Sequence, residues 1–122
     1  MAERIYQLSC NKGKAYSFVI YMANDAFLNI DLGRFEVSMK VRMTRATTSR
    51  LIATFNESNG RLNVDRAART ITVTLTSAYT LTLPESKNYY AIELAEIYDL
   101  HTGATKEAFR VIEGRFDILP QI

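Results

Sequence analysis

The strongest constraint on the fold is a run of strictly alternating residues at positions 34–44. Every odd-numbered residue of this run is apolar, and every even-numbered residue is polar or charged. Because successive side chains of a β-strand point to opposite faces, the run predicts a strand with one buried and one hydrated face. Residues 69–76 repeat the pattern, with Ile71, Val73 and Leu75 predicted to face inward and threonines outward.

Looser alternation predicts further strands in the rest of the chain. These segments are residues 14–22, 51–55, 90–100, 106–113 and 115–118. Gly114 interrupts the last of these patterns and predicts a β-bulge. A helix over residues 88–99 would bring Ile92, Ala95 and Tyr98 together, so a helical interpretation of that segment stays open beside the strand.

About seven or eight short strands separated by turns predict an all-β, Ig-like sandwich of two antiparallel sheets. A small closed β-barrel is the alternative fold. The length of 122 residues suits one domain. We assign residues 14–122 to the sandwich and residues 1–13 to an N-terminal arm or edge strand. Residues 77–89 leave room for one turn of helix before Pro84.

The residue inventory argues against catalysis and cofactor binding. The chain has one cysteine, Cys10, and one histidine, His101, so Cys/His zinc clusters and iron–sulfur sites cannot be assembled within it. His101 has no Gly-x-Ser-x-Gly nucleophile motif to serve. Glu93, Glu96 and Asp99 do not converge on a strand, because Glu96 points to the opposite face from the other two. We therefore expect no enzyme activity, cofactor or metal.

The sequence gives no sign of a membrane segment or a secretion signal. Residues 1–14 carry four charges and lack the apolar stretch of a signal peptide. The apolar run at residues 18–23 is much shorter than the ~20 residues that cross a bilayer. We expect a protein that is made in the cytoplasm and does not contact a membrane.

Charge is unevenly distributed along the chain. Residues 34–69 hold eight basic and three acidic side chains, whereas residues 85–117 hold four basic and seven acidic ones. Nucleic acid is not the expected partner, because aromatic residues do not alternate with the arginines and the net charge is only +2. The contrast predicts contacts between subunits, although an ordinary solvated surface would carry the same asymmetry.

Taken in order, the strand patterns resemble a bacteriophage module, the β-sandwich at the virion-proximal end of baseplate upper proteins and tail-fibre adaptors. The resemblance covers about residues 14–120. Its closing feature is the pattern Gly-x-Phe-x-Ile-x-Pro at residues 114–120. The other matching segments are residues 16–21, 29–37, 59–64, 69–76, 80–83 and 89–94.

The resemblance implies a structural subunit of a phage particle, such as a tail, collar, head-decoration or adaptor protein, located in the virion. Its expected partners are other virion proteins or copies of itself. The sequence shows no coiled coil or receptor-binding domain after the module, so we expect the sandwich to be the working part. A small cytoplasmic binding module or inhibitor is the alternative. The predicted subunit contacts are Ile5, Tyr6, Leu8, Arg42, Arg45, Arg50, Glu93, Glu96 and Asp99.

Overall fold

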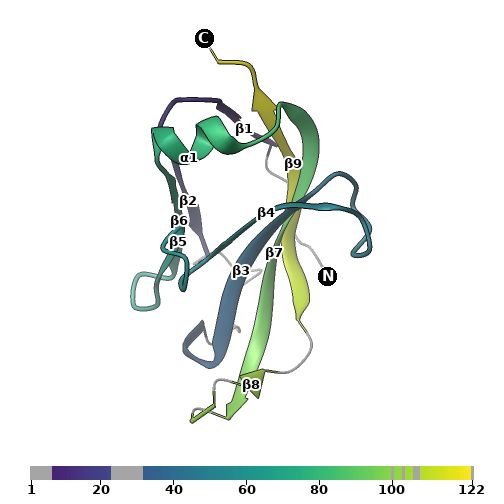
Figure 1. The fold of residues 1–122 in the computed structure, drawn as a ribbon. Helices are drawn as coiled ribbons and strands as arrows, with labels where there is room; N and C mark the ends of the chain where they lie inside the picture. The colour runs from purple at the N-terminus through teal and green to yellow at the C-terminus, as the bar shows by residue number, and fades with distance from the viewer. Residues whose placement is uncertain (1–6, 23–31, 100, 103, 106–107, 122) are drawn as a thin grey trace.

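Two β-sheets packed face to face form the structure, a computed structural model that describes residues 7–22, 32–99, 101–102, 104–105 and 108–121 (Figure 1). The larger sheet has the strand order β1-β9-β7-β3-β4, and a short strand, β8, also pairs with β7. The smaller sheet has the order β2-β6-β5. The predicted all-β sandwich is confirmed, and the described strands do not close into a barrel.

Nine strands, one α-helix and a 3-10 turn are present in the described residues. The larger sheet contains β1 (Gln7–Asn11), β3 (Phe35–Arg42), β4 (Leu51–Asn56), β7 (Ser86–Asp99), β8 (Ala104–Thr105) and β9 (Phe109–Leu119). The smaller sheet contains β2 (Tyr16–Tyr21), β5 (Leu62–Asp65) and β6 (Thr70–Leu75). The 3-10 turn η2 (Leu32–Arg34) leads into β3, and α1 (Ser77–Thr82) connects the two sheets.

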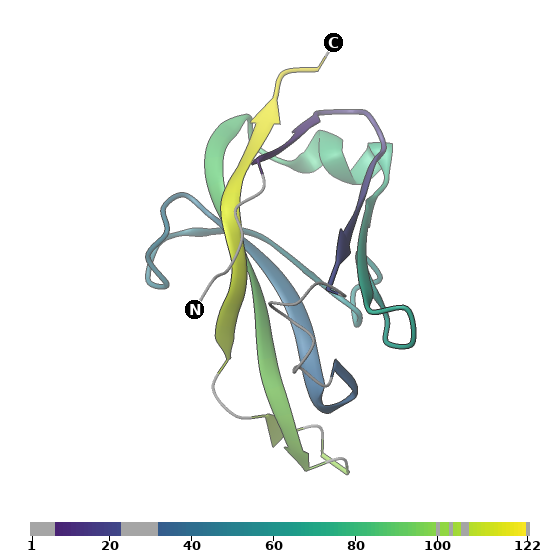
Figure 2. The ribbon, with the colours of Figure 1, turned by 180° about the vertical axis from the view of Figure 1, so that it is seen from behind.

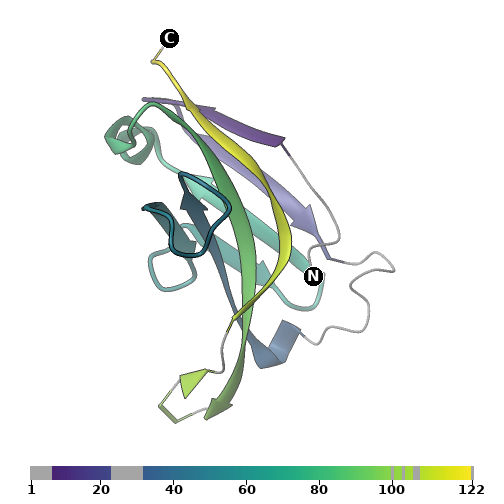
Figure 3. The same cartoon turned by 90° about the vertical axis from the view of Figure 1, so that its right-hand side faces the viewer.

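The two alternating runs form strands, and the faces that we predict to be buried are buried. In β3 the side chains of Val37, Met39 and Val41 are fully buried, and the residues between them are at least partly accessible. In β6 the same holds for Ile71 and Val73, while the threonines lie on the outer face. These apolar rows meet in the core between the two layers. Figures 2 and 3 show the two layers from behind and from the side.

Residues 88–99, for which a helical interpretation was an alternative, belong to a strand. β7 extends from Ser86 to Asp99 and pairs with β3 and β9 along most of its length. Its inward residues Tyr90, Ile92 and Leu94 are almost completely buried. Pairing on both sides satisfies the backbone of this long strand and places it in the centre of the larger sheet.

Two details of the sheets differ from the predictions. The pair β1–β9 is parallel, so the larger sheet is not wholly antiparallel. The predicted bulge at Gly114 is wrong, because Gly114 pairs regularly with Tyr90. The register between β7 and β9 shifts instead at Val111, which is the extra residue between two paired neighbours.

The start of the described chain is part of the sandwich. Residues 7–11 form β1, which is an edge strand of the larger sheet rather than a separate arm. Cys10 is buried in the core, and Leu8 is half-buried against it. The predicted contacts Ile5 and Tyr6 lie outside the described residues.

Helix α1 closes one end of the sandwich, between the end of β6 and the start of β7 (Figure 1). The hydroxyl of Thr76 caps the helix by accepting a hydrogen bond from the Tyr79 N–H. The fully buried Thr80 Oγ1 accepts a hydrogen bond from the Gly13 N–H at 3.0 Å and donates to the Lys14 carbonyl oxygen at 2.8 Å. One hydroxyl therefore anchors the β1–β2 turn to the helix.

We expect Thr80→Val to lower the free energy of unfolding by about 1–3 kcal/mol, because it leaves the Gly13 N–H and the Lys14 carbonyl oxygen, both in partly buried hydrogen bonds, without this partner. Chemical denaturation measures the change. Thr82→Val is the matched control, since Thr82 is exposed and its hydroxyl bonds only to the Tyr79 carbonyl in its own helical turn. Equal losses in the two variants would contradict the anchoring role of Thr80.

Candidate functional site on the outer face of the larger sheet

The outer face of the larger sheet carries a dense group of side chains, all but one of them charged, from β3, β7, β9 and the loop after β3. We call this group the outer-face cluster. Its members are Lys40, Arg42, Arg45, Tyr89, Glu93, Arg110, Glu113 and Arg115. The members on strands come together because residues directly opposite each other on paired strands project to the same face. Arg45 reaches the cluster from the β3–β4 loop, where its guanidinium lies over the Tyr89 ring.

Glu93 lies at the base of the cluster and is only 6% exposed. Its carboxylate lies 3.3 Å from the Lys40 ammonium, 3.9 Å from Arg42 Nη1 and 3.8 Å from Arg110 Nε. Taking a carboxylate out of water is unfavourable unless cations or hydrogen bonds compensate. Three cations from two neighbouring strands supply that compensation.

The β-bulge at Val111 positions one of these cations. Because Val111 is the extra residue, Glu93 pairs with Arg110 instead of Val111, while Ile92 pairs with Ile112. Directly opposite residues share a face, so the bulge brings Arg110 onto the same outer face as Glu93. A regular ladder would have placed the apolar Val111 there.

A small cavity of about 10 Å³ lies within the cluster, over the small side chain of Ala91. Its walls include Lys40, Arg42, Arg45, Tyr89, Arg110 and Glu113. Arg110 Nη1 also lies 3.4 Å from the Glu113 carboxylate. A cavity of this volume has room for about one water-sized atom.

Several N–H groups of the cluster are buried without a hydrogen-bond acceptor among the described residues. They are Nε and Nη1 of Arg42, Nε of Arg110 and Nε of Arg115. Buried donors in proteins ordinarily have a partner. The cluster therefore offers donors that the described part of the chain does not satisfy.

An aromatic ring borders the cluster. The guanidinium of Arg45 lies 5.4 Å from the centre of the Tyr89 ring, and that of Arg115 lies 5.8 Å from it. Tyr89 is directly opposite Arg115 in the β7–β9 ladder, which accounts for their proximity. Both distances are within the range of cation–π attraction.

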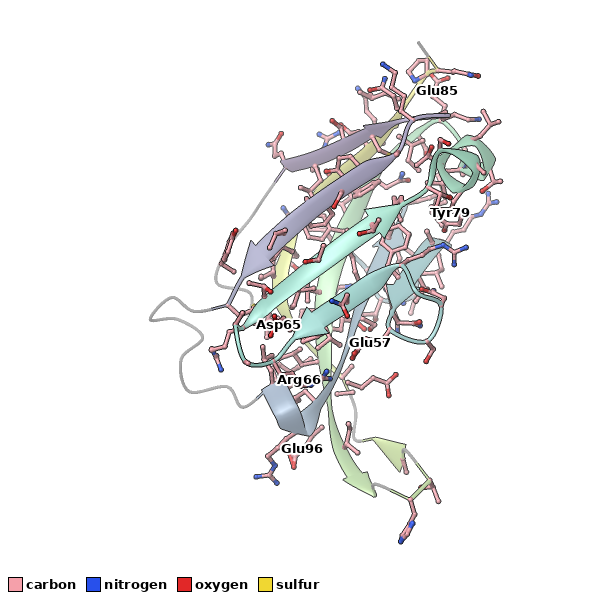
Figure 4. All side chains as sticks on the ribbon, turned by 90° about the vertical axis from the view of Figure 1, so that its left-hand side faces the viewer. Glu57, Asp65, Arg66, Tyr79, Glu85 and Glu96 are labelled. Carbon is pink, nitrogen blue, oxygen red and sulfur yellow. The ribbon has the colours of Figure 1, made fainter. Side chains whose placement is uncertain are left out.

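The structure brings three of the predicted contact residues into this one cluster: Arg42, Arg45 and Glu93. Arg42 and Glu93 are both predicted to make contacts between subunits, and in the structure they lie 3.9 Å apart within one chain. Arg50 is exposed next to β4, and Asp99 ends β7. Glu96 lies at the far end of the larger sheet, where it pairs with Arg34 at 3.6 Å (Figure 4).

Sequence reasoning missed five members of the cluster: Lys40, Tyr89, Arg110, Glu113 and Arg115. The alternation placed Lys40 on the outer face of its strand, but nothing local in the sequence says which strands are neighbours. The missing information was the pairing of β3 and β9 with the two sides of β7.

Charged contacts elsewhere join elements of the fold. Arg66 makes two hydrogen bonds to the Glu57 carboxylate, at 3.0 and 3.3 Å, and also donates to the carbonyl oxygens of Leu32 and Phe35 (Figure 4). Glu57 lies in the β4–β5 connection, and Leu32 and Phe35 lie just before β3 and at its start. Arg66 therefore links these two parts of the fold.

The remaining candidates for chemistry do not assemble into a catalytic group. His101 is exposed in the turn after β7. Burial raises the pKa of the Cys10 thiol, so the reactive thiolate is scarce at neutral pH. Within the described ranges, no three His, Cys, Asp or Glu side chains are arranged to hold a metal ion. The described helix is also too short to cross a membrane.

Comparison with known proteins adds no relative. Neither the protein-family models nor the curated proteins contain a match to this chain.

Proposed function

We propose that this protein acts through protein–protein contacts as a structural subunit of a bacteriophage particle, and that the outer-face cluster is its main contact surface. The observation that carries the proposal is the set of buried arginine N–H groups in the cluster that lack acceptors among the residues that the structure describes. A binding partner can supply those acceptors. The order of the strand patterns supports the phage assignment through the resemblance described above.

The composition of the cluster also suits a contact surface. Arginine and tyrosine are enriched where proteins bind one another, because both combine a large contact area with hydrogen-bonding groups. Here Arg45, Tyr89 and Arg115 stack beside a base formed by Glu93 and its cations. The sheet holds Tyr89, Arg115 and Glu93 in place before binding, which lowers the entropic cost of association.

Size-exclusion chromatography with light scattering tests the proposal on the purified protein over a range of concentrations. We expect species larger than the monomer to form as concentration rises, and to dissociate when salt reaches about 0.5 M, because salt screens exposed charge pairs. The variant Arg45→Glu, which places a carboxylate at the edge of the cluster, should remain monomeric. A wild-type protein that is monomeric at every concentration would contradict self-assembly through this face.

A further inference from the structure

We propose that the cavity in the outer-face cluster is a carboxylate-binding site, which takes one oxygen of an aspartate or glutamate side chain from a partner protein. The inference rests on the proposed function and adds to it the chemistry of the group recognised. Its donors are the Arg42 and Arg110 guanidiniums, with Arg45 and Lys40 at the rim.

The charge balance of the cavity favours an anion. Four cationic side chains line it, those of Lys40, Arg42, Arg45 and Arg110, against one carboxylate, that of Glu113. Glu93 neutralises part of this charge from beneath, yet its distances to Arg42 and Arg110 are those of ion pairs without hydrogen bonds. Both positive charge and N–H donors are thus left for an incoming anion.

The donor residues also line a very small space. The Arg42 and Arg110 side chains are only 13% and 22% exposed, so few water molecules can reach them. The cavity of about 10 Å³ holds roughly one oxygen atom. A single carboxylate oxygen on a flexible side chain fits these dimensions, and hydrogen bonds from charged donors to a carboxylate are among the strongest in proteins.

The same features argue against a nucleic-acid backbone. A strand of phosphates requires a continuous row of exposed cations. On this face the carboxylates Glu93, Glu113 and Asp117 are interspersed among the arginines, and Asp117 already lies 3.4 Å from Arg115.

The test is a titration of the intact protein, observed through the arginine Nε–Hε signals in two-dimensional NMR at fixed ionic strength. The probe is the capped dipeptide acetyl-Glu-Glu-amide, and acetyl-Gln-Gln-amide is its uncharged counterpart. We expect the Arg42 and Arg110 signals to shift saturably with the glutamate peptide and to stay in place with the glutamine peptide.

Three variants sharpen the test. Arg42→Gln and Arg45→Gln should each weaken binding of the glutamate peptide by about tenfold, because each removes a charged donor. Lys14→Gln, which removes the same charge from the exposed β1–β2 turn, should bind like the wild type. Glu93→Gln should bind the peptide more tightly than the wild type, because it removes the carboxylate that competes for the same cations.

Several outcomes would overturn the inference. Equal shifts with both peptides, or equal weakening by Lys14→Gln and Arg42→Gln, would mean that no specific carboxylate site exists. Tighter binding of inorganic phosphate or of an oligothymidylate than of the glutamate peptide would assign the cluster to phosphate instead. If the protein self-associates through this face but does not bind the peptide, the proposed function stands and the carboxylate site is wrong.

Discussion

Replacing Val73 with aspartate is expected to unfold the protein. Val73 is completely buried between the two sheets, and its neighbours in the ladder, Phe18 and Leu62, offer no cation to a carboxylate. An unpaired buried charge costs several kcal/mol or more, and the total stability of a domain is only about 5–15 kcal/mol. Circular dichroism and chemical denaturation measure the loss.

The neighbouring residue provides the matched control. Thr74 is exposed on the opposite face of the same strand, so Thr74→Asp is expected to leave the protein folded with a small change in stability. Val37→Asp repeats the test in the larger sheet, where Val37 is equally buried. If Val73→Asp and Thr74→Asp had the same effect on the free energy of unfolding, the register of the smaller sheet would be wrong.

The second large effect is expected at Glu93. Glu93→Ala removes the shared counter-ion of Lys40, Arg42 and Arg110 and leaves these cations close together. Breaking a buried ion pair from one side costs about 3–5 kcal/mol, and we expect about 2–4 kcal/mol here, because the three cations keep part of their hydration. Chemical denaturation at neutral pH gives the value.

Glu113→Ala is the control on the same face. Glu113 pairs with Arg110 alone among the described residues, and its side chain is 23% exposed, so its removal should cost about 1 kcal/mol or less. If Glu113→Ala lowered the free energy of unfolding as much as Glu93→Ala, Glu93 would have no special role beneath the cluster.

The layers and the buried faces could be predicted from the sequence because they depend on a local rule. Alternation at residues 34–44 and 69–76 decides which side chains of a strand face the core, whichever strands lie beside it. The position of the bulge could not be predicted in the same way. Glycine at residue 114 is a typical local signal, but the register of β9 against β7 places the extra residue at Val111.

Predicting the candidate site requires information that is not local in the sequence. Its members come from three separate stretches of sequence, around residues 40–45, 89–93 and 110–115, and they meet only because β7 lies between β3 and β9. The uneven charge of the chain was visible in the sequence, and it suggested contacts between subunits. Pairing of β3 with β7 brings the basic Arg42 and the acidic Glu93 into contact instead.

The parallel pairing of β1 with β9 determines when the larger sheet can be completed during synthesis. β1 leaves the ribosome long before its hydrogen-bonding partner is translated: Asn11 and Pro120, which bond at this junction, are 109 residues apart in the chain. Closing so long a loop is slow compared with forming hairpins between neighbouring strands. Until β9 has emerged, Cys10 and Leu8 have no sheet to join, so the nascent chain exposes this apolar edge while the segments between β1 and β9 are being translated.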